Sequence, residues 1–212
     1  MKIKWYGHSC FVFTASDGTR LVTDPFDGSI GYKIPRVEAD IILVSHDHYD
    51  HNYIEAISGD PVIVNTPGSH NVRGVHINGV STFHDDMKGG KRGSNIIFVF
   101  KMDGLNVCHL GDLGHILLRE HVEKIGPVDV LHIPVGGTFT IDAAAAQEVV
   151  SQLKPRVIIP MHFKTQDVSL PIAPVDDFIE RMGGGEELNS CFVEITPETL
   201  PVDQKIIVLK YK

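Results

Sequence analysis

The feature that most constrains this chain is a cluster of potential metal ligands between residues 46 and 51. The segment reads HDHYDH and directly follows the apolar run 41–44. A chain of this composition in random order would contain the pattern His-x-His-x-Asp-His only about 0.003 times. Residues two apart on an extended segment project to the same side, so His46 and His48 can share one cation. Asp50 and His51 lie on the next turn, so this one loop can supply half of two metal sites.

Composition limits the class of protein. The chain has 212 residues, of which 42% are hydrophobic and 22% are charged, and its formal net charge is −8. This apolar content excludes intrinsic disorder and is enough for one compact domain spanning residues 1–212. The acidic balance argues against a long nucleic-acid footprint, because such binding needs clustered Lys and Arg. A small substrate, including an anionic one, is the expected partner, and the sequence does not fix the oligomeric state.

The chain carries no signal for export or membrane insertion. Apolar runs such as 96–100 stop far short of the roughly 20 residues that a membrane span needs. The N-terminus reaches the polar segment 7–9 too soon for the apolar core of a signal peptide. The three cysteines are widely spaced and form no Cys-x-x-Cys pair, which favours a reducing compartment. We therefore expect a cytoplasmic protein without membrane insertion.

Short apolar runs between turn signals predict mostly β structure. The expected strands are 2–6, 11–14, 20–23, 41–44, 62–65, 96–101, 107–110, 130–133, 157–159 and 206–210. The expected helices are 52–57, 116–125, 142–153 and 175–182, with Asp142 as the N-cap of the third. The first half reads as an antiparallel meander, and the whole as two β-layers flanked by helices.

Three more potential ligands follow later apolar runs. His84 ends the run 80–83, Asp112 follows 107–111, and His162 follows 157–161. A sheet can bring the ends of these runs to one edge beside the 46–51 loop. The sequence therefore predicts a composite site that draws on several strands.

At these residues the chain resembles the metallo-β-lactamase-fold hydrolases. The resemblance covers about residues 1–165 and implies an α+β fold, a four-layer αββα sandwich. It also implies that His46, His48 and His84 hold one metal, that Asp50, His51 and His162 hold a second, and that Asp112 bridges the two.

Softer motifs point to one branch of that family. The segments 7–9, 24–26, 111–115 and 134–140 are similar to those of ascorbate-phosphate lactonase and of N-acylphosphatidylethanolamine phospholipase D. The long insertions of the β-lactamases and of the large RNA-processing members are missing, which disfavours both of those activities.

Imidazole and carboxylate ligands suit two divalent metal ions, with zinc expected and manganese or iron as alternatives. Two such ions can generate a bridging hydroxide at neutral pH. The expected function is hydrolysis of a small ester, lactone or phosphodiester. Asp50 is a candidate to orient the hydroxide. His115 is either a general acid or the cap of a helix start.

Other polar residues have both a functional and a structural interpretation. Asp24 can accept from a metal-bound histidine or simply start a turn, and His8 can face the pocket or satisfy a turn. Lys164 can contact an anionic substrate or be solvated. His109 is expected in the core or behind the ligands. The remaining histidines are expected to be surface or hydrogen-bonded structural residues: His70, His76, His121 and His132.

Three alternatives remain open. A nuclease of the same fold would cleave RNA or DNA in a salt-sensitive manner. A non-enzymatic metal-binding module would keep the ligands without turnover. A redox di-iron protein is disfavoured, because His48 stands where flavodiiron relatives have Glu.

Overall fold

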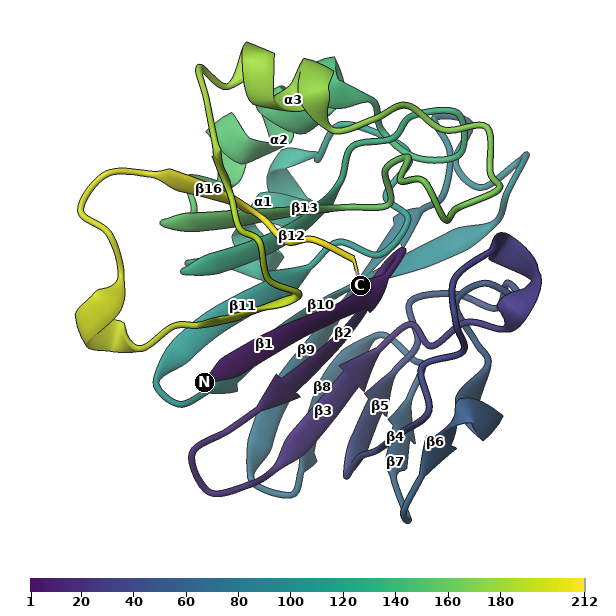
Figure 1. Cartoon of the computed structure of the whole chain (residues 1–212), viewed down its shortest axis with the longest axis vertical. Helices are drawn as coiled ribbons and strands as arrows, with labels where there is room; N and C mark the ends of the chain where they lie inside the picture. The colour runs from purple at the N-terminus through teal and green to yellow at the C-terminus, as the bar shows by residue number, and fades with distance from the viewer. Residues whose placement is uncertain (212) are drawn as a thin grey trace.

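The strands of the chain form two large sheets that pack face to face (Figure 1). The computed structural model describes residues 1–211. Within these residues, the six-stranded sheet has the order β15 (Phe192–Glu194), β1 (Lys2–Gly7), β2 (Cys10–Thr14), β3 (Arg20–Thr23), β5 (Ile41–Leu43) and β7 (Val62–Val64). The eight-stranded sheet has the order β14 (Glu186–Glu187), β16 (Lys205–Val208), β13 (Val157–Met161), β12 (Val130–Pro134), β11 (Leu105–His109), β10 (Ser94–Met102), β9 (Val75–Phe83) and β8 (Gly68–Val72).

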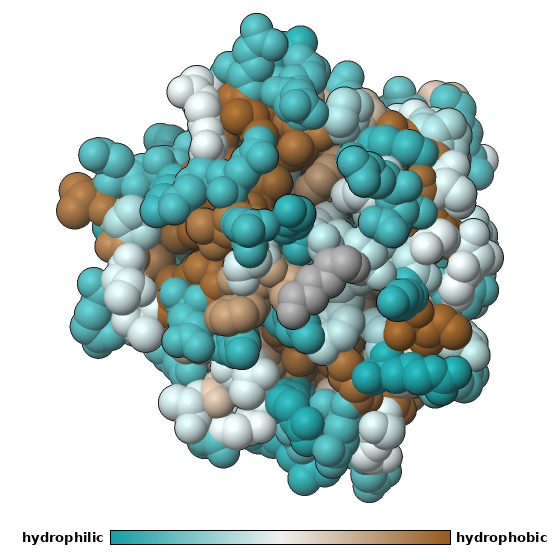
Figure 2. Space-filling view, in the orientation of Figure 1, coloured by the Kyte–Doolittle hydropathy of each residue, from teal (hydrophilic) through white to brown (hydrophobic). Residues whose placement is uncertain are grey.

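The main core lies between the two sheets. Because side chains alternate along a strand, β2 turns Phe11 and Phe13 toward the eight-stranded sheet, where Phe13 packs on Phe100 with ring centroids 5.0 Å apart. Cys10 and Val12 point to the opposite face and belong to a second apolar cluster. Both faces of the six-stranded sheet are therefore buried. On the outer surface, hydrophilic residues cover most of the face in Figure 2, with apolar areas between them left of centre.

Different elements cover the two outer faces. The helices α1 (Arg119–Ile125), α2 (Ala143–Leu153) and α3 (Asp176–Arg181) lie beside the eight-stranded sheet (Figure 1). The outer cluster on the six-stranded sheet is closed by the 3₁₀ turns η1 (Gly28–Ile30) and η2 (Ile54–Ala56) and by the segment 168–172. A short pair of strands, β4 (Val37–Glu38) and β6 (Ile57–Ser58), lies on the same side, and η3 (Pro197–Thr199) precedes β16. The predicted α+β sandwich is confirmed, with turns in place of regular helices in one outer layer.

Two of the four predicted helices agree closely with the structure. The helix expected over 142–153 is α2, and Asp142 caps it by accepting from the Ala145 N–H at 2.9 Å. The helix expected over 175–182 is α3. The helix expected over 116–125 begins only at Arg119, because Leu118 is extended.

The helix predicted over 52–57 is wrong. The segment forms the 3₁₀ turn η2 and then strand β6, which pairs in parallel with β4. The N–H of Tyr53 donates to the Pro25 carbonyl at 2.8 Å instead of continuing a helix. Tertiary hydrogen bonds thus override local preference in a segment too short to hold a helix alone.

The antiparallel meander is correct for β1, β2 and β3 and again for β8, β9 and β10, but not for the strands between them. Strand β5 pairs in parallel with β3 and with β7. Parallel pairing requires a crossover, and the crossover from β5 to β7 carries the 46–51 loop. The ligand loop therefore leaves the sheet at the same end as the residues that follow β3. Among residues 1–211, no helix is long and apolar enough to cross a bilayer.

Candidate metal centre

Six segments place ligand-type side chains at one end of the sandwich. His8 follows β1, Asp24 follows β3, the 46–51 loop follows β5, His84 follows β9, Asp112 follows β11, and His162 follows β13. The seven ligands predicted from the sequence all lie in this cluster. Their donor atoms form three overlapping groups in which every pair lies within 4.8 Å: His46, His48 and His84; His46, His51 and Asp112; and Asp50, His51 and His162 with His8.

Asp112 lies at the centre of the cluster. Its Oδ2 atom lies 3.3 Å from His51 Nε2, 3.3 Å from His84 Nε2 and 3.2 Å from His162 Nε2. Its backbone N–H donates to Asn95 Oδ1 at 2.9 Å, and Asn95 Nδ2 donates to the Leu110 carbonyl at 3.0 Å. A buried amide therefore fixes the turn, so that the carboxylate faces histidines from both sides of the centre.

Gly111 is required in this turn for two reasons. Its φ of +56° lies in the left-handed region, where side chains are disfavoured. A Cβ atom at this position would also collide with the side chains of Asn95 and Ser45. The Gly-Asp pair therefore lets the chain approach the Asn95 amide closely enough to aim Asp112 inward.

The first group consists of three histidine rings from two elements. The His46 ring lies 4.5 Å from the His48 ring and 4.7 Å from the His84 ring, measured between centroids. His46 Nδ1 is 2.9 Å from Ser45 Oγ, so its Nε2 is the nitrogen left to face the cluster. This arrangement presents several imidazole nitrogens to one point.

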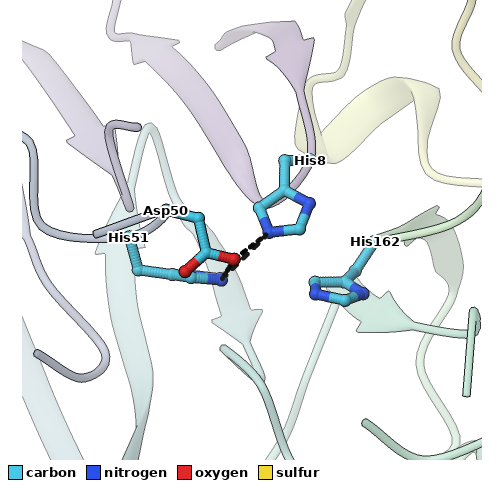
Figure 3. Close-up of side chains that lie close together, drawn as sticks. All are labelled: His8, Asp50, His51 and His162. Atoms are coloured by element: carbon cyan, nitrogen blue, oxygen red, sulfur yellow. Dashed lines mark hydrogen bonds and ion pairs between the residues drawn. The ribbon is translucent and has the colours of Figure 1, made fainter. Parts of the chain in front are cut away.

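The third group, Asp50, His51 and His162 with His8, contains a residue whose role the sequence left open. His8 Nε2 lies 3.1 Å from His51 Nε2 and 3.2 Å from Asp50 Oδ2. The His8 and His162 ring centroids are 4.1 Å apart. Figure 3 shows these side chains converging from separate elements. Of the two interpretations made from the sequence, the structure therefore supports a His8 that faces the site.

Asp24 supports the ligands from behind. Its Oδ2 lies 3.2 Å from His51 Nδ1 and accepts from Ser45 Oγ at 2.8 Å, while its Oδ1 accepts from the Ser45 N–H at 2.8 Å. A carboxylate that binds the far nitrogen of a metal-binding histidine fixes its tautomer and ring orientation. The partner predicted for Asp24 is thus present. Ser45 extends the same network to His46.

Three residues of the site adopt left-handed backbone conformations without being glycine. The φ angles are +51° for His8, +40° for Asp24 and +51° for His162. Such conformations cost on the order of 1–3 kcal/mol each and persist only where surrounding contacts hold them. The His162 N–H donates to the His8 carbonyl at 3.3 Å, and Trp5 Nε1 donates to the same carbonyl at 3.0 Å. The backbone is therefore strained at three of the turns that aim side chains into the centre.

Burial and neighbouring charges separate the protonation states of the cluster. Burial and the adjacent His51 lower the pKa of His46 to about 3, and burial with His162 lowers the pKa of His8 to about 4. Burial also opposes a charged His51, but Asp112 and Asp50 outweigh it and raise the pKa of His51 well above its ordinary value. His46 and His8 are therefore neutral at pH 7, which is the form that binds a metal.

The donor set fits divalent cations. Asp24 and Asp112 are buried and Asp50 is mostly buried, yet within residues 1–211 their ion-pair partners are histidines alone, with no Lys or Arg. Buried charges need a compensating charge, and a single protonated His51 cannot balance three carboxylates. In the same described region, buried His46 Nε2 and Asp112 Oδ1 make no hydrogen bond. Cations at the centre would bind these atoms and balance the carboxylates.

A cavity of about 430 Å³ opens beside the first group. His84 lines one wall, and Arg92, Thr138 and Phe139 line another. Arg92 Nη2 donates to the Thr138 carbonyl at 2.9 Å, and the guanidinium lies 5.5 Å from the centre of the Phe139 ring. A small molecule in this cavity would touch a metal ligand and a cationic side chain together.

Asp85 holds the loop that forms one wall of this cavity. Its two oxygens accept four backbone N–H bonds of 2.7 to 2.9 Å, from Met87, Gly89, Lys91 and Arg92. Burial alone would raise the pKa of Asp85, but these four donors hold it below its usual range. Sequence reasoning missed this residue, although its place directly after His84 and before a Gly-rich loop was a usable signal.

The structure does not support a general-acid role for His115. Its ring lines the cavity, but Nδ1 lies 2.7 Å from the Ile116 carbonyl and Nε2 accepts from the Phe83 N–H at 3.3 Å. Both nitrogens are thus engaged with the backbone, and neither is free to give a proton to a leaving group in this conformation. His115 does not cap a helix either, because α1 begins at Arg119 with Leu118 before it; its ring instead ties the end of β9 to residue 116.

The structure likewise favours structural roles for two other polar residues. Lys164 Nζ donates to the carbonyls of Val168 and Leu170, at 2.7 and 3.0 Å, so it ties a loop rather than contacting an anion. His109 Nε2 lies 2.9 Å from the Ser9 carbonyl, and its Nδ1 accepts from the Gly111 N–H at 3.1 Å. His109 therefore supports the turn before Asp112, as expected for a residue behind the ligands.

The expectation for His132 is wrong. This residue is neither at the surface nor hydrogen-bonded: it is fully buried in β12, and within the part of the chain that the structure describes neither ring nitrogen has a partner. Its ring packs against Phe11 and Phe13 at centroid distances of 4.4 and 5.1 Å. Burial lowers the pKa of His132 well below its ordinary value, so it behaves as a neutral aromatic core residue.

Comparisons with known proteins identify the family. A beta-lactamase superfamily domain matches residues 2–162. A UPF0173 metal-dependent hydrolase of Thermococcus kodakarensis is 31% identical over an alignment that covers 87% of this chain and 92% of that protein. The chain belongs to the UPF0173 family.

Solved structures show the same fold for this UPF0173 protein. A Thermotoga maritima protein of the metallo-β-lactamase superfamily, described as a proposed Zn-dependent hydrolase, is 42% identical. The match covers 100% of this chain and 99% of that one, with a TM-score of 0.84. An isothiocyanate hydrolase from Delia radicum gut bacteria shares the fold alone, at 15% identity and a TM-score of 0.67 over 99% of this chain and 97% of that one. The metallo-β-lactamase fold expected from the ligand motif is thereby confirmed.

Proposed function

We propose that this UPF0173 protein is a dinuclear metal-dependent hydrolase of small molecules. The observation that carries the proposal is the position of Asp112, whose Oδ2 lies 3.2 to 3.3 Å from histidines of both ligand groups. His46, His48 and His84 would hold one cation and Asp50, His51 and His162 the other, with Asp112 between them. We propose further that residues 1–212 are one hydrolase domain, because one apolar core contains residues from Met1 to Leu209.

Zinc is the cation that we propose, with manganese or iron as alternatives, because imidazole and carboxylate donors suit all three. The description of the Thermotoga maritima relative names zinc. A pair of such cations lowers the pKa of water and polarises a substrate oxygen. No serine or cysteine nucleophile is then required.

The side chains of the centre would prepare the reaction in distinct ways. Asp24 and Ser45 orient His51 and His46 through their Nδ1 atoms. Burial raises the pKa of Asp50, but His51 and His8 outweigh this effect and keep the carboxylate ionised. An ionised Asp50 can accept a hydrogen bond from an attacking water and so orient it. Asp85 keeps the cavity wall in place beside His84.

We propose a small, anionic substrate with an ester, lactone or phosphodiester bond. The cavity volume of about 430 Å³ limits the substrate size. Arg92 uses Nη2 on the Thr138 carbonyl, but it has no carboxylate within ion-pair distance among residues 1–211, so its other N–H groups are available to an anionic group. The motif similarity to ascorbate-phosphate lactonase and to N-acylphosphatidylethanolamine phospholipase D agrees with these bond types.

Metal content per chain tests the proposal. Untagged protein purified without added metal or chelator should contain about two equivalents, and Asp112→Ala should retain less than half of them. Asp177→Ala is the matched control, because Asp177 pairs with Arg181 on α3, outside the cluster. No bound cation after reconstitution, or full metal occupancy in Asp112→Ala, would contradict the proposal.

A panel of phosphodiester, lactone and ester substrates, with Asp50→Ala as the inactive reference, then identifies the bond that is hydrolysed. Salt-sensitive RNA cleavage would instead favour the nuclease.

A further inference from the structure

We propose that His8 is a direct ligand of the cation held by Asp50, His51 and His162, and that substrate binds at the other cation. This inference rests on the proposed two-cation centre. It goes beyond the ligand set implied by the resemblance, which does not include His8. It also assigns different tasks to the two cations.

The first argument is the side from which His8 approaches. His8 Nε2 lies 3.1 Å from His51 Nε2, the same nitrogen that lies 3.3 Å from Asp112 Oδ2. Asp24, which supports His51 from behind, instead contacts Nδ1 at 3.2 Å. His8 is thus on the side of the ring that faces the cation position, where a supporting residue would have no place.

The second argument is the spacing of the donor atoms. A tetrahedral zinc with bonds of about 2.0–2.1 Å separates its ligand atoms by about 3.3 Å. His8 Nε2 lies 3.1 Å from His51 Nε2 and 3.2 Å from Asp50 Oδ2, and the latter two atoms are 3.8 Å apart. With one ring nitrogen of His162, the four donors lie within 4.8 Å of one another (Figure 3). These distances are those of ligands around one ion.

The third argument is how the backbone fixes His8. Its carbonyl accepts from Trp5 Nε1 and from the His162 N–H, so the two histidines that flank the cation position are bonded to each other through the backbone. Gly7 before it has a φ of +105°, and a Cβ there would press on the Tyr32 ring. The turn is therefore built to hold His8 against the cluster rather than to leave it mobile.

His8 makes the two positions unequal. The cation beside it would have donors from His8, Asp50, His51 and His162 as well as Asp112, whereas the other would have only His46, His48, His84 and Asp112. The cation with five protein donors has less room for a further ligand than the cation with four, and a catalytic metal needs such room. The cavity agrees with this division, because His84 lines it and no ligand of the His8 side does.

Cobalt titration of the metal-free protein tests the inference, with metal affinity and the Co²⁺ absorption spectrum as readouts. The wild type should bind two Co²⁺ in two steps. In His8→Ala the tighter step should weaken at least about 10-fold and its spectrum should change with the loss of a nitrogen donor. In His84→Ala the weaker step should be the one affected. His76→Ala is the matched control, since His76 is exposed on β9, and should leave both steps unchanged.

Several results would overturn the inference. If the affinity of the tighter step is unchanged in His8→Ala, His8 does not belong to the centre. If that step loses affinity but keeps the wild-type Co²⁺ spectrum, His8 is a positioning residue and not a ligand. Should His8→Ala fail to fold, ¹⁵N-histidine labelled wild type loaded with ¹¹³Cd²⁺ decides, because a ligand nitrogen shows direct coupling to the metal and any other nitrogen does not. If the wild type binds two cations, and neither the affinity of His8→Ala nor the His8 nitrogen signal shows an effect, this inference alone is refuted. If the wild type binds no cation, the proposed function is refuted as well.

Discussion

His51 is the side chain on which the charge of the centre depends most. Its Nε2 lies near Asp112 and Asp50, and its Nδ1 lies near Asp24. Burial lowers the pKa of His51, but these carboxylates raise it well above 6.5, so the cation-free protein carries a proton here at pH 7. In that state the raised pKa contributes stability below pH 6.5 that is lost as the pH rises through the folded-state value.

We therefore predict that cation binding at pH 7 releases about one proton, from His51. Since the proton competes with the cation, the apparent affinity should increase with pH until the pKa of His51 is passed. Calorimetric titration of Zn²⁺ in buffers of different ionisation enthalpy counts the proton, and His51→Ala should release none. A wild-type count of zero would show that His51 is neutral before the cation binds.

At this scale the sequence predicted much of the cluster but not all of it. The seven candidate ligands could be placed together because they sit in a rare motif or directly after apolar runs. His8 and Asp85 could not be assigned in the same way. The position of His8 depends on a backbone hydrogen bond to His162, far away in the sequence, and the role of Asp85 depends on the shape of one loop.

At the scale of elements, the 85–93 loop should depend on one carboxylate. Asp85→Asn keeps one oxygen and loses the charge that its four backbone donors face. We predict at least tenfold faster hydrogen exchange at the amides of Met87, Gly89, Lys91 and Arg92, since bonds to an ionised acceptor are the stronger ones.

Asp86→Asn is the matched control for this loop. Asp86 is an exposed neighbour whose only ion-pair partner among residues 1–211 is Lys91, at 3.8 Å. Hydrogen exchange in Asp86→Asn should match that of the wild type. Metal content should stay near the wild-type value in both variants, because His84 directly follows β9 and does not belong to the loop. Equal exchange in Asp85→Asn and the wild type would mean that the loop is held by other contacts.

The elements that the sequence predicted well are those whose own residues determine them. Helix α2 has a side-chain cap, a run of alanines and a buried apolar face. The sequence missed the interior strand β9, in which Asn78 and Gly79 interrupt the apolar alternation and leave only the run 80–83. It also missed β8, β14 and β15, which are mostly exposed strands at sheet edges, and the two-residue strands β4 and β6. These five lack the apolar signal of a core strand. Their existence is decided by the neighbouring strand, which a local pattern does not contain.

At the scale of the whole molecule, the centre connects the two sheets. His8 and the 46–51 loop extend from the six-stranded sheet, and His84, Asp112 and His162 extend from the eight-stranded one. A cation bound by both sets stabilises only the state in which the sheets are packed. The free energy gained is RT ln(1 + [M]/Kd), or about 4 kcal/mol when the free metal is a thousand times Kd.

We therefore predict that removing the metal lowers the melting temperature by several degrees and that Zn²⁺ restores it. With about 2–4 °C per kcal/mol for a chain of this size, 4 kcal/mol corresponds to roughly 8–16 °C. Differential scanning calorimetry of chelated and reloaded protein measures the shift. In Asp112→Ala, chelation and reloading should change the melting temperature by less than half of the wild-type shift. An equal melting temperature with and without metal would show that the sheets pack independently of the centre.

The hydrogen bond between His162 and His8 also bears on how the protein is made. During synthesis the 46–51 loop leaves the ribosome long before His162 exists, so a cation captured then would have only a fraction of its final ligands. The complete donor set forms when the turns after β1 and β13 meet, which requires nearly all of both sheets. If the proposed ligands are correct, the cation beside His8 and His162 is therefore bound only by an almost completely folded chain.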